Sequence, residues 1–405
     1  MNKLLLKILA VILLIMLLIF QTVVYATEYV WSNYDETVLT NVNTNETGNF
    51  LNLESGSAVL IEQNTGKVLY DHNMHEKLRP ASVTKVMTLL LIMEAIDNGQ
   101  ITLETKIPCS EKASKMGGSQ IWLDTREELT VHEMLKAICV VSANDCTVAM
   151  AEYLAGTEEQ FVQRMNDKAK QLGMNDTTFK NCHGIDEDGH LTSSYDIALM
   201  SRELLTKHPT ITNYTTIWMD SLRDGKSELV NTNKLIRNYE GITGLKTGST
   251  SLALFNLSAS ATRNELSLIA VIMKGPTGPI RFSEAKKLLD YGFSNYCYKK
   301  LGEKGDTVKK VLVEKGVEDC VEVMFESDAG VLIKKSQEKS ITQEINIPEK
   351  VSAPIENGQK IGEIVFTLEN QELARINVIS KKEIKKVGFF NNSSYMFEKW
   401  FNLLR

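Results

Sequence analysis

The chain has 405 residues, of which 43% are hydrophobic and 24% charged, and its formal net charge at pH 7 is −6. This balance is typical of a globular protein, and it excludes wholesale disorder, a collagen-like chain and a polytopic membrane protein. Because the net charge is negative, the chain has no overall attraction for nucleic acid, and we expect no nucleic-acid partner.

The N-terminus has the pattern of a secretory signal peptide. Lys3 and Lys7 precede thirteen uninterrupted apolar residues at 8–20, and a small-residue end follows at 24–26. Because a membrane-spanning helix needs ~20 apolar residues, this run favours a cleaved signal peptide at 1–26 over an anchor. An uncleaved anchor stays the alternative, since the leucines before Lys7 could lengthen the run. We therefore expect an exported protein.

The first regular elements follow a polar linker at 27–52. The pattern predicts a β-hairpin at 58–73, with its turn at 64–66. After Pro80, a dense apolar run predicts a buried helix from Ser82 to Ile96, with Ser82 in its first turn.

The middle of the chain is predicted to be helical. Thr130 and Glu133 have the Thr-x-x-Glu spacing of a capping box, which starts one helix. Three more helices are expected, and they begin after Asn144, at Thr157, and at Ser193 or Ser194.

After Gly241 the hydrophobic period changes to two. This period predicts strands at 244–250, 255–262 and 265–275, and a helix is expected at 283–293. Strands and helices mixed within one compact stretch indicate an antiparallel sheet packed with helices, which is an α+β fold.

The domain organisation follows from the order of these predicted helices and strands. We assign 53–297 to one domain of mixed strands and helices, and 298–380, with its short alternating strands, to a small β-rich domain. The remaining tail, 381–405, combines a lysine cluster with an apolar helical face at i, i+3, i+4 and i+7, formed by Phe397, Trp400, Phe401 and Leu404. This predicts an amphipathic helix on the membrane surface, and a helix packed on the β-rich domain is the alternative.

No pattern in the chain points to a metal or a cofactor. The six cysteines form no C-x-x-C pair, so zinc-ribbon and thioredoxin chemistry lack their spacing. Cys139 and Cys146 lie in apolar surroundings and are expected to be buried, inert thiols. His72 and His75 are three residues apart without an H-E-x-x-H motif, which favours a solvated turn over a metal site.

Three short motifs carry the chemistry. Ser82 to Lys85 is S-x-x-K, Ser142 to Asn144 is S-x-N, and Lys246 to Gly248 is K-T-G. Each motif alone is weak evidence for a catalytic site. Together they are stronger, because they occur in this order and because Ser82 starts a predicted helix, Ser142 lies between two predicted helices and Lys246 lies on a predicted strand.

The first motif could form an activated nucleophile. Residues three apart share one face of a helix, so Lys85 can reach the Ser82 hydroxyl. A lysine acts as the base only when burial or a nearby positive charge lowers its pKa, and Lys246 could supply that charge. The Ser82 amide, in the first turn, could donate to an oxyanion.

The other two motifs could supply the remaining groups of such a site. Ser142 can pass a proton between Lys85 and a leaving amine, and Asn144 can hold a substrate amide. The K-T-G strand can pair with an extended peptide. On that strand the residues expected to bind a terminal carboxylate or an oxyanion are Lys246, Thr247 and Ser249.

The three motifs match the signature of penicillin-binding proteins and serine β-lactamases. More narrowly, residues 57–293 resemble the low-molecular-mass penicillin-binding proteins that are D-alanyl-D-alanine carboxypeptidases, with the stretches RPASVTKVMT, VVSANDCTVAMAEYLAG, LGMNDTTFKNCHGID, GLKTGST and IRFSEAKKLL. The resemblance implies helices around a five-stranded antiparallel sheet, and removal of the last D-alanine from peptidoglycan pentapeptides without a cofactor.

By the same resemblance each motif residue has a role. Ser82 is the acyl-enzyme nucleophile, also acylated by β-lactams, and Lys85 is the general base. Ser142 and Asn144 fill the second motif, and the third is filled by Lys246, Thr247 and Gly248. Arg281 matches an arginine that helps to bind the substrate carboxylate, whereas an ordinary surface pair with Glu284 is its alternative.

Other functions stay open at this stage. A serine β-lactamase of class A would use a glutamate in an E-x-x-L-N string, and none occurs between Asn144 and Lys246. A non-catalytic receptor for β-lactams or peptidoglycan is a further alternative. The motifs cannot distinguish a transpeptidase from a carboxypeptidase, because the two differ only in whether an amine or water accepts the acyl group.

Overall fold

The computed structural model describes residues 49–387, which fall into two compact units. The first unit holds the described residues through Lys300 together with Gly330–Lys339. The second holds Leu301–Ala329 and the described residues from Ser340 onward. The predicted signal peptide, most of the polar linker and the apolar face of the C-terminal tail lie outside the described residues.

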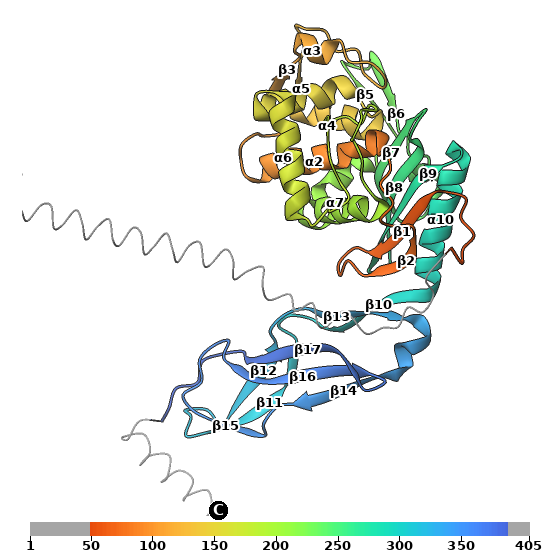
Figure 1. The fold of residues 1–405 in the computed structure, drawn as a ribbon. Helices are drawn as coiled ribbons and strands as arrows, with labels where there is room; N and C mark the ends of the chain where they lie inside the picture. The colour runs from red at the N-terminus through yellow and green to blue at the C-terminus, as the bar shows by residue number, and fades with distance from the viewer. Residues whose placement is uncertain (1–48, 388–405) are drawn as a thin grey trace, which may run out of the picture. The chain divides into compact units, whose positions relative to one another are not determined.

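The first unit is built on a five-stranded antiparallel sheet in the order β2-β1-β9-β8-β7 (Figure 1). This confirms the sheet that the family resemblance implied. Its strands are β1 (Ser57–Glu62), β2 (Val68–His72), β7 (Ile242–Thr250), β8 (Leu254–Arg263) and β9 (Leu266–Gly275). The predicted hairpin is therefore β1 and β2, and β7 is an edge strand.

Helices cover both faces of this sheet, and the alternation of side chains along β1 shows how. Val59 and Ile61 belong to the large core that the central helices form, whereas Ala58 and Leu60 pack on the other face with residues of α10. The large core involves α2 (Lys85–Asp97), α4 (Val131–Val140), α5 (Asn144–Ala155), α6 (Glu158–Gln171) and α7 (Ser194–Lys207). α10 (Gly278–Asn295) covers the opposite face.

Local capping explains where several helices begin. Thr130 and Glu133 form the predicted capping box of α4, with the hydroxyl accepting from the Glu133 amide at 3.2 Å and the carboxylate accepting from the Thr130 amide at 2.8 Å. Thr157 and Ser193 cap α6 and α7 with their hydroxyl oxygens alone, which accept from the amides of Gln160 and Asp196. α10 begins five residues earlier than the predicted helix at 283–293, because Thr277 caps it.

The helix predicted from Ser82 begins differently. Residues Ala81–Thr84 form a short 3-10 helix, η2, and the α-helix starts only at Lys85. Ala81 has φ 49°, a left-handed conformation that a right-handed α-helix cannot contain. The Ser82 turn is therefore a tight entry to α2 rather than its first α-helical turn.

Smaller elements complete the first unit. Three two-stranded sheets lie outside the main sheet. They are β3 (Lys106–Pro108) with β4 (Glu128–Thr130), β5 (Met219–Leu222) with β6 (Ser227–Val230), and β10 (Tyr296–Gly302) with β13 (Ala329–Lys334). The short helices are α3 (Glu111–Ser114), η3 (Pro209–Ile211), α8 (Thr212–Thr215), α9 (Leu235–Asn238) and η4 (Lys335–Ser340).

The second unit is all β, as the sequence predicted. Its six-stranded sheet has the order β14-β16-β17-β12-β11-β15. The strands are β11 (Thr307–Glu314), β12 (Cys320–Phe325), β14 (Ile341–Asn346), β15 (Lys350–Ser352), β16 (Lys360–Leu368) and β17 (Gln371–Ser380). Residues 330–339 group with the first unit rather than with this sheet, because β13 pairs with β10.

Within residues 49–387 no helix has the length and apolar content needed to cross a membrane. All six cysteines lie in this range and are free thiols, and Cys139 and Cys146 are buried. Burial raises the pKa of the Cys139 thiol to about 12, which fits an inert thiol.

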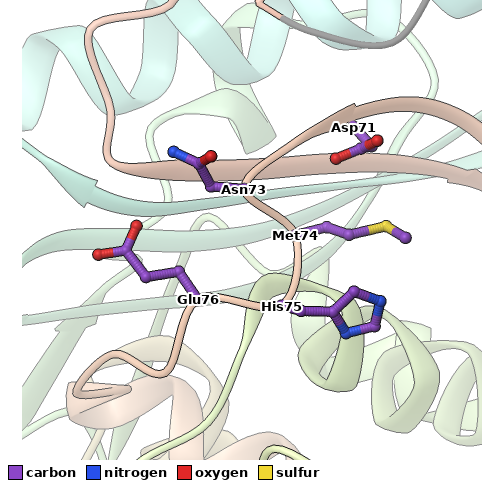
Figure 2. A pocket seen from close by; sticks show the side chains of 5 residues that line it. All are labelled: Asp71, Asn73, Met74, His75 and Glu76. Atoms are coloured by element: carbon purple, nitrogen blue, oxygen red, sulfur yellow. The ribbon is translucent and has the colours of Figure 1, made fainter.

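The segment after β2 borders a surface hollow of about 520 Å³, lined by Asp71, Asn73, Met74, His75 and Glu76 (Figure 2). His75 is largely exposed, and its Nδ1 lies 2.9 Å from a carboxylate oxygen of Asp176. None of the residues in this hollow belongs to the three motifs.

Candidate active site

The nucleophile motif lies where η2 leads into α2. Lys85 Nζ donates a hydrogen bond to Ser82 Oγ over 3.0 Å. Lys85 is completely buried although it carries an amine, and its pKa is well below the usual value, because of burial and then the charge of Lys246. A neutral amine at this distance can accept the proton of the serine hydroxyl.

Two further acceptors hold the Lys85 amine in place. Nζ donates to Asn144 Oδ1 and to the backbone carbonyl of His183, each over 2.6 Å. The amine is therefore fixed by three oxygen atoms from three different parts of the chain. The contact with His183 was not predicted from the sequence, because a backbone carbonyl leaves no mark on residue type.

The second motif lies in the turn between α4 and α5. Ser142 has φ 65°, its side chain is buried, and its Oγ has no hydrogen-bond partner within the part of the chain that the structure describes. Asn144 is the first residue of α5, and its Nδ2 donates to the Gly117 carbonyl over 2.7 Å. Asn144 thus contacts Lys85 directly, a role that the sequence reasoning had not given it.

The third motif lies on β7. Lys246 is 1% exposed, and its Nζ donates to the Thr247 carbonyl over 3.0 Å. Burial, and to a smaller degree the charge of Arg281, lower the pKa of Lys246 to about 7. Thr247 Oγ1 lies 2.7 Å from Thr232 Oγ1, and Ser249 is exposed. Since β7 is at the edge of the sheet, the backbone beyond it is open to a further strand.

Gly248 lets β7 approach the nucleophile turn. A Cβ at this position would lie 2.8 Å from the Val83 nitrogen and 2.9 Å from both the Ser82 nitrogen and the Pro80 oxygen. Only a glycine permits this distance between two stretches of backbone.

Arg281 reaches the same strand from α10. It is 9% exposed, and its Nη1 donates to the carbonyls of Gly248 and Asn256 over 3.1 and 3.2 Å. The alternative of a surface pair with Glu284 is wrong: Arg281 is buried, and the Glu284 carboxylate instead accepts hydrogen bonds from the Glu54 amide and the Ser55 hydroxyl. Arg281 therefore stabilises β7 from behind and adds positive charge there.

The site includes groups that residue patterns alone did not identify. Gly184 has φ 94°, and a Cβ there would lie 1.9 Å from the Ala81 oxygen, so this glycine is required for the 181–184 segment to pack on the nucleophile turn. The signal in the sequence is the histidine-glycine pair of NCHGID, which is part of the family resemblance.

The fold and these three motifs, which meet around η2 and β7, define a penicillin-binding-protein-like enzyme. The family model described as D-alanyl-D-alanine carboxypeptidase, peptidase S11, matches residues 41–277, and that of the penicillin-binding protein 5 C-terminal domain matches residues 296–386. The chain belongs to the D-alanyl-D-alanine carboxypeptidase family, whose members are serine hydrolases of peptidoglycan.

Curated relatives agree with this family. The chain is 46% identical over 340 residues to D-alanyl-D-alanine carboxypeptidase DacF of Bacillus subtilis, covering 83% of this chain and 87% of the relative. It is 30% identical over 355 residues to DacC of Escherichia coli, covering 85% and 88%. These relatives favour the peptidase over the β-lactamase and receptor alternatives.

Solved structures show the same architecture. Penicillin-binding protein 5 of Haemophilus influenzae matches with a TM-score of 0.68 and 29% identity, over 82% of this chain and 98% of that chain. Penicillin-binding protein D2 of Listeria monocytogenes, in its ampicillin-bound form, matches with a TM-score of 0.56 and 29% identity, over 60% of this chain and 99% of that chain.

Proposed function

We propose that this protein removes the terminal D-alanine from peptidoglycan pentapeptides through an acyl-enzyme on Ser82. The observation that carries the assignment is the 3.0 Å hydrogen bond from a buried Lys85 amine to Ser82 Oγ. In the acylation step Lys85 takes the hydroxyl proton while Oγ attacks the carbonyl carbon of the penultimate D-alanine. The peptide bond then breaks, and the leaving amine receives a proton through Ser142.

Water completes the cycle. With Lys85 again as base, a water molecule attacks the ester carbonyl, releases the shortened peptide and returns the proton to Ser82 Oγ. The backbone amides of Ser82 and Ser249 are the proposed oxyanion donors in both steps. Their proximity is supported by the close packing of Gly248 on the Ser82 turn.

The substrate is proposed to extend β7 by one strand. Its terminal carboxylate is then bound by the side chains of Lys246 and Thr247. Arg281 acts on the carboxylate through its charge and through the Gly248 carbonyl that it holds, rather than by an exposed side chain. No metal or cofactor takes part in this scheme.

We also propose that β-lactams acylate Ser82, since the related Listeria protein was solved in an ampicillin-bound form. The predicted signal peptide at 1–26 and the amphipathic tail at 381–405 support export and attachment to the extracellular face of the cytoplasmic membrane. Cell fractionation of the full chain, compared with a chain ending at residue 387, tests that location.

The function is tested with the purified protein and a pentapeptide ending in D-Ala-D-Ala. We expect release of free D-alanine, and an increase in intact mass with penicillin that is lost in Ser82→Ala. An unchanged mass increase in that variant would contradict the assignment of Ser82. Added amine acceptor distinguishes the outcomes, because a transpeptidase would form a new amide whereas a carboxypeptidase forms the free acid.

A further inference from the structure

Glu158, the first residue of α6, is a buried carboxylate outside the three motifs. It is 7% exposed, and its Oε2 lies 2.9 Å from Lys112 Nζ. The neighbouring Glu159 also pairs with Lys112, at 3.1 Å, but its side chain is 76% exposed. The two glutamates therefore share one lysine and differ in what else they touch.

The other oxygen of Glu158 faces the segment that carries His183. Oε1 accepts from the Cys182 backbone amide over 3.2 Å and from the Cys182 thiol over 3.3 Å. It also lies 3.4 Å from His183 Nε2. One carboxylate oxygen thus accepts both hydrogen bonds from Cys182 and lies against the ring of the next residue.

The His183 ring is held as a neutral imidazole. Burial, followed by the charge of Lys85, lowers the pKa of His183 to about 4. The Ile185 amide donates to Nδ1 over 3.2 Å, so the ring hydrogen is on Nε2 and faces Glu158. The neutral ring therefore faces the carboxylate with its N–H at 3.4 Å, whereas the hydrogen bonds that Oε1 accepts come from Cys182.

The backbone carbonyls of Cys182 and His183 are hydrogen-bonded to α2, the helix that carries Lys85. The His183 carbonyl accepts from Lys85 Nζ, and the Cys182 carbonyl accepts from Thr88 Oγ1, each over 2.6 Å. Glu158 thus holds the segment through the amide and thiol of Cys182, while the carbonyls of Cys182 and His183 accept hydrogen bonds from α2.

We propose that Glu158 is a positioning residue for Lys85, acting through the His183 carbonyl. The inference rests on the proposed role of Lys85 as the base. Without the carboxylate, the amide and thiol of Cys182 lose the acceptor that holds them, and the adjoining His183 carbonyl can shift away from the lysine amine. The amine would then lose one of the two acceptors, Asn144 Oδ1 and the His183 carbonyl, that hold it within reach of Ser82 Oγ.

The test measures acylation of the full chain by a fluorescent penicillin, separated into the rate constant at saturation and the apparent dissociation constant of the first complex. Glu158→Ala is expected to lower the saturating rate constant by roughly 10–100-fold, as for a small misplacement of a catalytic group, with little change in the dissociation constant. Glu158→Gln keeps an acceptor oxygen and is expected to restore most of the rate.

Glu159→Ala is the matched control, because it also removes a partner of Lys112 but leaves Cys182 and His183 held. It is expected to acylate at the rate of the unchanged protein. Glu158→Asp, which keeps the charge but shortens the side chain, gives an intermediate rate and serves where the alanine variant does not fold.

The result that would overturn the proposal is a Glu158→Ala protein whose folded fraction acylates at the normal saturating rate. Equal losses in the Glu158 and Glu159 variants would overturn it as well, because they would place the effect in Lys112. Penicillin labelling that persists in Ser82→Ala is a separate outcome, and it would contradict the proposed function itself.

Discussion

Gly248 on β7 lies against the backbone of Ser82, and a Cβ at Gly248 would come within 2.9 Å of the Ser82 nitrogen. The two residues are far apart in sequence, yet their packing sets the distance between the strand expected to bind substrate and the nucleophile. All three atoms that such a Cβ would meet first belong to the backbone, so no flexible side chain can move aside.

Gly248→Ala is therefore expected to separate β7 from the Ser82 turn. A displacement of about 1 Å at a reacting group costs on the order of 100-fold in rate, so we expect penicillin acylation to fall by about that factor. Stopped-flow measurement of acylation checks it. Gly278→Ala is the control, since its Cβ would meet only Phe255, at 3.7 Å, and it should acylate normally. Normal acylation by Gly248→Ala would contradict the steric argument.

The sequence predicted best what local rules determine. The hairpin of β1 and β2 follows from alternation and a glycine turn, and the start of α4 follows from Thr130 and Glu133. The strands β7, β8 and β9 follow from a period of two. The five-stranded order of the sheet did not follow from any of these patterns; the family resemblance implied the sheet.

The contacts missed were those made by the backbone across long separations. Lys85 meets the carbonyl of His183 98 residues away, and Asn144 meets the carbonyl of Gly117 27 residues away. A carbonyl is present at every residue, so its use cannot be read from residue type. Arg281 shows the same limit: the sequence left a surface pair with Glu284 open as an alternative, and only the fold shows that Arg281 is buried against the carbonyls of Gly248 and Asn256.

Replacing Ser142 should affect the acylation rate without affecting stability. Its hydroxyl is buried without a hydrogen-bond partner among the described residues, so Ser142→Ala removes an unsatisfied polar group and should not lower the melting temperature. If the hydroxyl relays protons, acylation should fall by roughly 100-fold or more. Calorimetry and penicillin labelling of the same sample measure both.

Ser201→Ala is the matched control for that prediction. Ser201 is also buried, but its hydroxyl lies 2.8 Å from Ser258 Oγ. Its loss should lower the melting temperature while the folded protein still acylates at the normal rate. The proton-relay role would be excluded by a Ser142→Ala protein that acylates normally.

Lys246 is expected to lower the stability of the fold because its amine is buried, although the same amine is proposed to bind the substrate carboxylate. Its pKa is about 7 in the folded protein, against 10.5 for a lysine in the unfolded chain. Because the folded pKa is lowered, the unfolded chain binds more protons between pH 7 and pH 10.5, and stability rises with pH across that window. Below pH 7 the full cost of the buried charge is present.

Lys246→Met should therefore be the more stable protein and the poorer enzyme. We expect a melting temperature higher by roughly 2–8 °C at pH 6, corresponding to about 1–2 kcal/mol after loss of the Thr247 hydrogen bond, and a gain that shrinks toward pH 10. Without the nearby charge the pKa of Lys85 rises, so the acid limb of acylation moves to higher pH. Calorimetry and acylation rates across this pH range test both expectations, and a variant less stable than the unchanged protein at pH 6 would show that the buried charge carries no net cost.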